Sequence, residues 1–208
     1  MNKLTIGIIS ALALAGSLPA NAQFNIVNPL PQKIQATGFT TVPQSVSIKT
    51  TNQRQQSIAV AALKGALKVE QGAKFTVTLG IKGDKSVKAY TKHLPNKAEA
   101  YWLSVSDKGA VVVGNDEEGL FYGVQTLLGS MAQGKLEKGT VSDWPDVDFR
   151  GTVEGFYGTP WSHQARLSQI EFYGRNKMNT YIYGPKDDPY HRDQWRKPYP
   201  ADEAQRIK

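Results

Sequence analysis

A strand–helix–strand pattern in the last third of the chain limits the folds available to this sequence. Residues 149–158, FRGTVEGFYG, form a short strand pattern with a glycine-rich, aromatic end, and Ser162 then provides an N-cap for a helix over 163–178. Residues 179–183, NTYIY, predict a second, buried strand. A strand, a helix and a strand at this spacing are typical of a parallel sheet or barrel.

The length after this point constrains the second domain. A (β/α)8 TIM barrel needs about 250 residues, whereas only 60 residues run from Phe149 to Lys208, and YPADEAQRIK reads as the opening of a further helix. The helix over 163–178 is expected to face the strands with Leu167, Ile170 and either Phe172 or Tyr173. We therefore expect residues 145–208 to be the first βα units of an incomplete, truncated barrel.

The preceding residues, 23–144, predict an α/β domain that ends at the Trp144-Pro145 linker. FTVTLGI over 75–81 alternates strictly with period two, which indicates a half-buried strand. Residues 23 to about 44 are rich in Gln, Pro, Thr and Asn and read as irregular. Other expected elements are a strand over 45–49, helices over 55–69 and 84–94, a hairpin over 101–114 and an apolar helix after Asp116.

Residues 1–22 predict a secretory signal peptide. Lys3 precedes the apolar run IGIISALALAG, and Ala20-Asn21-Ala22 supplies small residues for cleavage before Gln23. The run is too short for a membrane span. The chain has no cysteine, so neither a lipid-anchored cysteine nor disulfides are expected. We expect an exported protein, periplasmic or secreted.

The charge distribution does not favour nucleic acid as a partner. The mature chain carries 24 basic and 18 acidic residues, with no run of five or more positive ones. Scattered charge of this kind favours a solvated surface over a nucleic-acid groove. We expect neither nucleic-acid binding nor a membrane span.

Polar and aromatic residues follow both strands of the C-terminal segment. They lie over 154–158 after the first strand and over 184–188 after the second. In a parallel barrel these strand ends meet at one rim, where active sites are built. Gly155 would let a ligand approach the backbone, and Lys186 could donate hydrogen bonds to hydroxyl or carbonyl oxygens. The alternative is that the tyrosines of these segments only fill the core and rim.

Two of these motifs resemble a known family. RGTVEGFYGTPWSHQARL and KMNTYIYGPKDDPYHR are similar to the start of the catalytic barrel of glycoside hydrolase family 84, the O-GlcNAcases and bacterial β-N-acetylglucosaminidases. The earlier segments YWLSV, VVVGNDEEGLFYGVQTL and DWPDVDFRG resemble the α/β domain that precedes the barrel in families 20 and 84. The resemblance covers nearly the whole mature chain.

The resemblance implies an activity and a set of residues. It implies removal of terminal β-linked N-acetylglucosamine by a substrate-assisted retaining mechanism, in which one Asp polarises the 2-acetamido group and a neighbouring Asp is the general acid and base. That pair is expected beyond Lys208, so no catalytic residue is expected in this chain. The family pattern makes Gly155 a backbone contact to the sugar hydroxyls, places Tyr157 near the glycosidic bond and has Lys186 bind the ring hydroxyls. The implied partner is an N-acetylglucosamine-containing glycan or glycoprotein, and no cofactor or metal is implied.

Three acids of the C-terminal segment are interpreted as structural. Asp187 and Asp188 follow Lys186, which would lower a carboxylate pKa, the wrong direction for a general acid. We expect them to cap their loop, and Glu154 to be a buried hydrogen-bond acceptor. His163 and His191 lack metal-site spacing. If the 208-residue product is complete, the alternative function is a non-catalytic carbohydrate-binding or interaction module.

Overall fold

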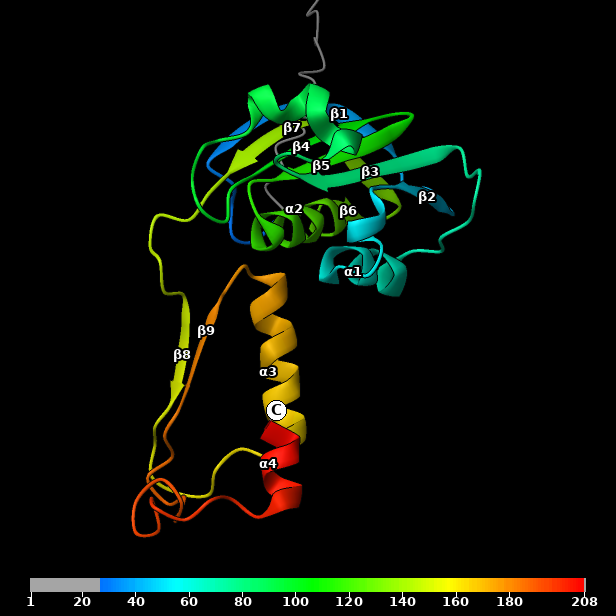
Figure 1. Ribbon diagram of the computed structural model, residues 1–208. Helices are drawn as coiled ribbons and strands as arrows, with labels where there is room; N and C mark the ends of the chain where they lie inside the picture. The colour runs from blue at the N-terminus through cyan, green and yellow to red at the C-terminus, as the bar shows by residue number, and fades with distance from the viewer. Residues whose placement is uncertain (1–26, 208) are drawn as a thin grey trace, which may run out of the picture.

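The computed structural model describes residues 27–207 and consists of two lobes (Figure 1). The predicted signal peptide over 1–22 lies outside the described residues. The N-terminal lobe is built on a seven-stranded mixed sheet in the order β1-β7-β4-β5-β3-β2, with β6 paired to β7. The C-terminal lobe holds the two-stranded sheet β8-β9. Among the described residues, no helix combines the length and apolarity needed to cross a bilayer.

The elements of the N-terminal lobe alternate along the chain between strands and helices. Strands β2 and β3 and strands β3 and β5 pair in parallel, and the other pairs are antiparallel. The strands are β1 (Lys33–Thr41), β2 (Val46–Lys49), β3 (Phe75–Ile81), β4 (Tyr101–Ser106), β5 (Gly109–Gly114), β6 (Met131–Ala132) and β7 (Lys135–Asp143). The helices are η1 (Asn52–Arg54), α1 (Ile58–Ala66), η2 (Lys85–His93) and α2 (Glu117–Gly129).

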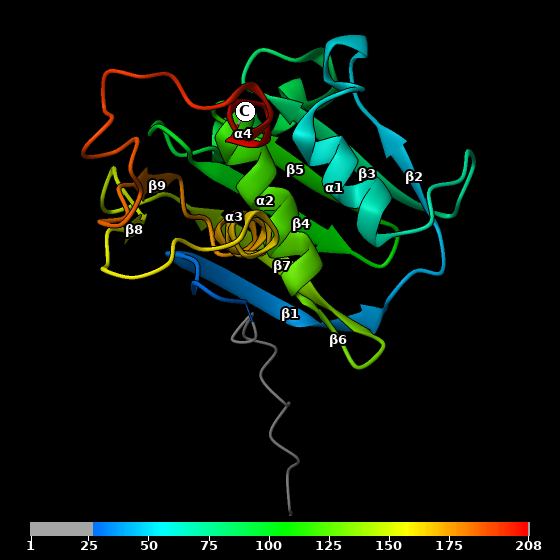
Figure 2. The same ribbon diagram turned by 90° about the horizontal axis from the view of Figure 1, so that it is seen from below.

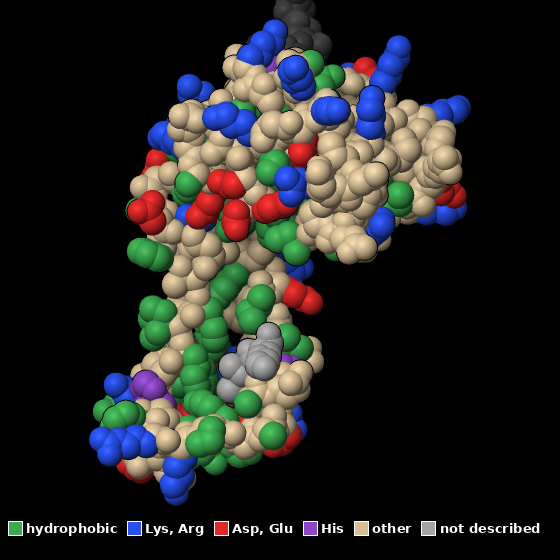
Figure 3. Space-filling model, viewed as in Figure 1, with side chains coloured by type: hydrophobic (Ala, Val, Ile, Leu, Met, Phe, Trp, Pro, Cys, Tyr) green, Lys and Arg blue, Asp and Glu red, His purple; other side chains and the backbone are tan. Residues whose placement is uncertain are grey.

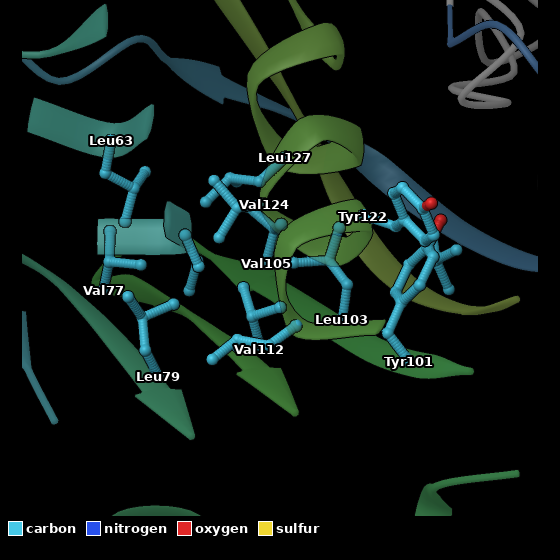
Figure 4. Packing of buried hydrophobic residues seen from close by; sticks show 14 of the residues in the cluster. Leu63, Val77, Leu79, Tyr101, Leu103, Val105, Val112, Tyr122, Val124 and Leu127 are labelled. Carbon is cyan, nitrogen blue, oxygen red and sulfur yellow. The ribbon is translucent and has the colours of Figure 1, made fainter. Parts of the chain in front are cut away.

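Helices α1 and α2 lie across one face of this sheet and enclose the main hydrophobic core (Figure 2). The alternation predicted for β3 is confirmed, because Val77 and Leu79 are fully buried on the helix side. They pack with Leu63 of α1 and Leu127 of α2 (Figure 4). The opposite face carries a smaller cluster, in which Val87 of η2 is buried with Trp102 and Val113.

One expectation for this lobe is wrong, and another is confirmed only in part. The segment before residue 44 is not irregular, because Lys33–Thr41 is an edge strand paired along its length with β7. Its half-buried positions are Ile34, Ala36, Gly38 and Thr40, and these mostly small or polar residues give the strand no strong apolar period. The second predicted helix is present and begins directly after Asp84, but it is the 3₁₀ helix η2. Asp84, whose residue type favours the N-cap position, makes no side-chain capping bond to it. The Asp84 carboxylate instead accepts hydrogen bonds from the Ile81 backbone N–H and from Arg54.

The C-terminal lobe is one strand–helix–strand unit followed by a short helix. It contains β8 (Gly151–Glu154), α3 (His163–Arg175), β9 (Thr180–Tyr183) and α4 (Ala201–Ile207). Strands β8 and β9 are parallel, as the pattern predicts. Their backbones approach so closely that a Cβ on Gly151 would lie 1.5 Å from the Thr180 carbonyl oxygen. The predicted N-cap Ser162 accepts a hydrogen bond from the Ala165 N–H.

The predicted inward face of α3 is largely wrong. Tyr173 is buried, but Leu167, Ile170 and Phe172 are 42%, 52% and 46% exposed. Two strands cover only a narrow part of the helix surface, which leaves these apolar side chains at its margins. Strand β9 is likewise not fully buried, since Ile182 is 53% exposed. The apolar side chains of this lobe form a continuous column in the space-filling view (Figure 3).

Buried polar contacts join the two lobes. Lys177, in the turn between α3 and β9, extends its Nζ to within 2.7 Å of the Asp143 carboxylate at the end of β7. The same ammonium group donates to the Tyr101 hydroxyl at 3.0 Å. Arg150, just before β8, forms an ion pair with Glu99 of the N-terminal lobe. These contacts hold the lobes together at the amino ends of β8 and β9, away from the loops that carry the predicted site.

Candidate functional site

The loops that follow β8 and β9 lie side by side at the carboxyl edge of the small sheet. The backbone ladder continues past the strands, with the Gly184 N–H bonded to the Glu154 carbonyl at 2.9 Å. The Lys186 N–H is likewise bonded to the Phe156 carbonyl at 3.0 Å. Parallel strands bring their carboxyl ends to one edge, so the structure places both predicted motifs next to each other.

The three predicted substrate-binding residues share this edge. Tyr157 is 77% exposed and Lys186 is also exposed, so both side chains can reach a ligand in solvent. Gly155 directly follows β8 and is partly buried. A Cβ at this position would lie 3.1 Å from the Val153 side chain, which is tight packing for any larger residue. The arrangement offers a tyrosine face, an ammonium donor and an accessible stretch of backbone.

Asp187 connects the two loops. Its carboxylate accepts a hydrogen bond from the Gly158 N–H at 2.8 Å, across 29 residues of sequence. Gly158 has a φ of 101°, a left-handed conformation that glycine adopts without strain. Asp187 thus fixes the loop that carries Tyr157 against the loop that carries Lys186.

Asp188 is buried and holds its own loop in shape. Its carboxylate accepts hydrogen bonds from the Tyr183 and Tyr199 hydroxyls and from the N–H groups of Tyr190 and His191. Burial alone would raise the pKa of Asp188, but these four donors outweigh it and hold the pKa below its usual value. The carboxylate is therefore ionised at neutral pH and committed to the loop.

Glu154 is the last residue of β8. It is fully buried, and both of its oxygens accept from the Arg166 guanidinium at 2.9 Å. It also accepts from the Trp161 N–H at 2.8 Å and from the Tyr181 hydroxyl. Burial opposes ionisation, yet these donors lower the pKa of Glu154 below its usual range. Burial and the bond to this carboxylate raise the pKa of Tyr181 to about 12.

The acids of this segment therefore fix loops, as the sequence interpretation has them. The sequence did not indicate the partners of these acids. Asp187 bridges two loops, Asp188 accepts hydrogen bonds from tyrosine hydroxyls, and Glu154 binds the Arg166 side chain of α3. A tyrosine-rich segment around acidic residues is a weak signal for such contacts, because their partners lie up to 29 residues away.

A pocket of about 360 Å³ lies between α3, β9 and α4. Arg166, Tyr181, Tyr183 and Glu203 contribute to its lining. Tyr157 and Lys186 do not line it. Arg166 and Tyr181 of this lining also hold Glu154, and Tyr183 holds Asp188, whereas Glu203 bonds to neither acid. The pocket is therefore bounded partly by structural hydrogen bonds and partly by the apolar margin of α3.

The described residues offer no arrangement of three or more His, Cys, Asp or Glu side chains that could hold a metal ion. His163 is the first residue of α3, and His191 packs beside Gly184 at 3.3 Å from where a Cβ would stand. Both histidines therefore occupy helix-start and loop positions.

Two protein-family models match the chain in succession. Residues 25–144 match the model described as Glycosyl hydrolase family 20, domain 2. Residues 150–208 match the model described as beta-N-acetylglucosaminidase. The first of these matches covers more than half of the chain.

Individual relatives are similar to parts of this chain. Protein O-GlcNAcase of Rattus norvegicus is 44% identical over 57 residues, 27% of this chain and 6% of that protein. Beta-hexosaminidase of Vibrio vulnificus is 30% identical over 124 residues, 59% of this chain and 14% of that protein. The chain thus spans only a small part of these relatives.

Solved structures extend the similarity to both lobes. CpGH84B superposes with a TM-score of 0.71 and 34% identity, over 87% of this chain and 33% of that one. The β-hexosaminidase of Streptomyces plicatus, at a TM-score of 0.56 and 19% identity, shares the fold over 81% of this chain. The chain belongs to the glycosyl hydrolase family 20, domain 2, family through residues 25–144, and the segment that follows is similar to the beta-N-acetylglucosaminidase family model and to CpGH84B.

Proposed function

We propose that this chain is the N-terminal part of an exported β-N-acetylglucosaminidase that removes terminal β-linked N-acetylglucosamine from a glycan or glycoprotein. The loops after β8 and β9 bind the terminal sugar in this proposal. The observation that carries it is the junction of these loops, where the Lys186 N–H bonds to the Phe156 carbonyl and the Asp187 carboxylate bonds to the Gly158 N–H. This junction brings Gly155, Tyr157 and Lys186 to one edge, and all three lie within the residues 150–208 that match the beta-N-acetylglucosaminidase model.

Each residue has a role that its chemistry supports. Lys186 donates charge-assisted hydrogen bonds to ring hydroxyls, which are strong when the ligand excludes water. The Tyr157 ring offers an amphipathic face near the glycosidic bond. Gly155 has no side chain of its own, so a ligand can approach its backbone groups closely. These are positioning contacts, which hold a sugar in one orientation without reacting with it.

In the proposed reaction, the 2-acetamido oxygen of the substrate attacks the anomeric carbon, and two neighbouring aspartates polarise that group and transfer the proton. We place these aspartates outside the residues described here. The engaged states of Glu154, Asp187 and Asp188 support this placement, because each carboxylate already accepts hydrogen bonds from the protein. The reaction as proposed uses no metal or organic cofactor.

The test is a titration of the 208-residue chain with N-acetylglucosamine, followed by NMR on the tyrosine and glycine signals. Binding should weaken at least tenfold in Tyr157→Ala and in Lys186→Met, and should be unchanged in Lys197→Met, an exposed lysine of the same lobe. We expect no hydrolysis of an aryl β-N-acetylglucosaminide by the chain alone. Equal binding by all three variants, or hydrolysis that survives both site changes, would refute the proposal.

A further inference from the structure

The positive charge of the protein is concentrated in the N-terminal lobe. Residues 27–144 contain fourteen Lys and Arg against nine Asp and Glu, whereas residues 145–207 contain nine of each. In the space-filling view, blue side chains cover the upper part of this lobe, and red ones gather lower down, toward the C-terminal lobe (Figure 3). The C-terminal lobe, which carries the proposed sugar-binding loops, thus has no net charge, and the N-terminal lobe carries the excess of positive charge.

Five exposed lysines on and beside η2 form what we call the η2 lysine surface: Lys82, Lys85, Lys88, Lys92 and Lys97. None of them takes part in the ion pairs formed by the described residues. In a 3₁₀ helix, side chains three residues apart are aligned, so Lys85 and Lys88 lie on one row about 6 Å apart. Repulsion between such neighbours is relieved by an anion.

The acids nearest to this surface are used elsewhere. Asp84, at the start of η2, is buried and binds Arg54. Glu99, which follows Lys97 in sequence, is turned toward Arg150 of the other lobe. Neither of these two carboxylates is therefore paired with a lysine of this surface.

The geometry of η2 argues against a lipid bilayer as the partner. A helix that inserts into a membrane surface presents an apolar face to the lipid. Here Val87 is fully buried and Tyr90 stacks on Trp102 at 5.8 Å, so the apolar side of η2 is turned inward against the sheet. Only the side of η2 that carries the lysines remains exposed for binding a partner.

The residue type argues against a nucleic acid. Arginine, with its planar fork of donors, is favoured for phosphate and base recognition. Residues 27–144 contain a single arginine, Arg54, and its guanidinium is bound to Asp84 and Glu117. The surface consists of ammonium groups, which act as separate point charges and suit a ligand with spaced single charges.

We propose that the η2 lysine surface binds an acidic polysaccharide, a linear chain of sugars that carry carboxylate or sulfate groups. The choice of a polysaccharide rests on the proposed function of the C-terminal loops. Binding at this surface raises the local concentration of chain ends around those loops without a contact to the cleaved sugar. The acidic chain and the terminal N-acetylglucosamine then occupy different lobes.

The test compares binding of the 208-residue chain to polygalacturonate and to neutral dextran by affinity electrophoresis at 50 mM and 200 mM salt. The triple variant Lys85→Gln, Lys88→Gln, Lys92→Gln should bind polygalacturonate at least tenfold more weakly. Its slope of log affinity against log salt should be smaller by about two. Lys64→Gln, Lys74→Gln, Lys197→Gln is the matched control, with the same change of charge at exposed positions outside the surface.

The proposal is overturned if the two triple variants weaken binding equally, since net charge would then explain it, or if the unchanged chain does not bind at 50 mM salt. Tighter binding to a 16-base-pair DNA duplex or to phosphatidylglycerol vesicles would also overturn it. The N-acetylglucosamine titration of the triple variant separates the two proposals. The triple variant should bind N-acetylglucosamine as the unchanged chain does. Loss of polygalacturonate binding would then leave N-acetylglucosamine binding intact.

Discussion

Replacing Lys177 with Met tests the idea that one buried ion pair joins the lobes. The side chains of Lys177 and Asp143 are only 8% and 10% exposed, and Nζ lies 2.7 Å from the carboxylate. The substitution keeps a linear side chain of similar length, and it leaves the Asp143 charge buried without its cation. Removing one partner of a buried ion pair costs about 3–5 kcal/mol.

The structure places the expected cost at the low end of that range. After the change, the Asp143 carboxylate still accepts hydrogen bonds from the Gln32 N–H at 3.1 Å and the Tyr101 hydroxyl at 2.9 Å. We therefore expect a loss of about 3 kcal/mol in the free energy of unfolding. The double variant Lys177→Met, Asp143→Asn removes both charges, so it should lose about 2 kcal/mol less than the sum of the single variants.

The assay is equilibrium urea unfolding of the 208-residue chain, followed by tryptophan fluorescence, with Lys64→Met as an exposed control. The control should change the free energy of unfolding by less than about 0.5 kcal/mol. Additivity of the two single changes within about 0.5 kcal/mol would refute the reasoning, because it would mean that Lys177 and Asp143 do not interact.

Two further predictions concern packing and pH. Gly109→Ala should lower the melting temperature, because a Cβ there would lie 2.3 Å from the Thr76 carbonyl oxygen. Gly65→Ala, in open space on α1, should instead raise the stability by up to about 1 kcal/mol. A higher melting temperature for Gly109→Ala than for Gly65→Ala in calorimetry would contradict this. The carboxylate of Glu154 has a folded pKa below its ordinary value of 4.5, so its contribution is present above that pH and is lost as the pH falls through the folded pKa. Glu154→Gln should therefore flatten the fall in melting temperature between pH 5 and pH 3, and an unchanged slope would show that the Arg166 contact does not stabilise the fold.

The sequence predicted the elements whose signals are local. The alternation in β3 and the N-cap at Ser162 each depend on a few consecutive residues, and both are confirmed. Strand β1 was missed because its main partner, β7, lies about a hundred residues later, and pairing with it supplies order that the polar sequence of β1 does not signal. Non-local pairing of this kind leaves little trace in a short window of sequence.

In the candidate site too, features that depend on local sequence could be predicted, and features that depend on distant contacts could not. Parallel strands place their carboxyl ends together, so the shared edge of Gly155, Tyr157 and Lys186 could be predicted from the strand–helix–strand pattern. The exposed margin of α3 could not, because it depends on how many strands cover the helix. The contact of Lys177 with Asp143 could not either, since it crosses between lobes that have separate sequence patterns.

The state of the carboxylates explains why the loops are suited to positioning a sugar. A general acid must hold its proton near neutral pH, which requires an environment that raises its pKa. The pKa values of Glu154 and Asp188 are instead lowered, because arginine, tyrosine and backbone donors outweigh the effect of burial. These ionised groups cannot donate a proton at neutral pH, but they fix the backbone on either side of Tyr157 and Lys186. Ionised carboxylates that accept hydrogen bonds from the loops keep the binding residues in place. Proton transfer in the proposed reaction then requires other carboxylates, in an environment that raises their pKa.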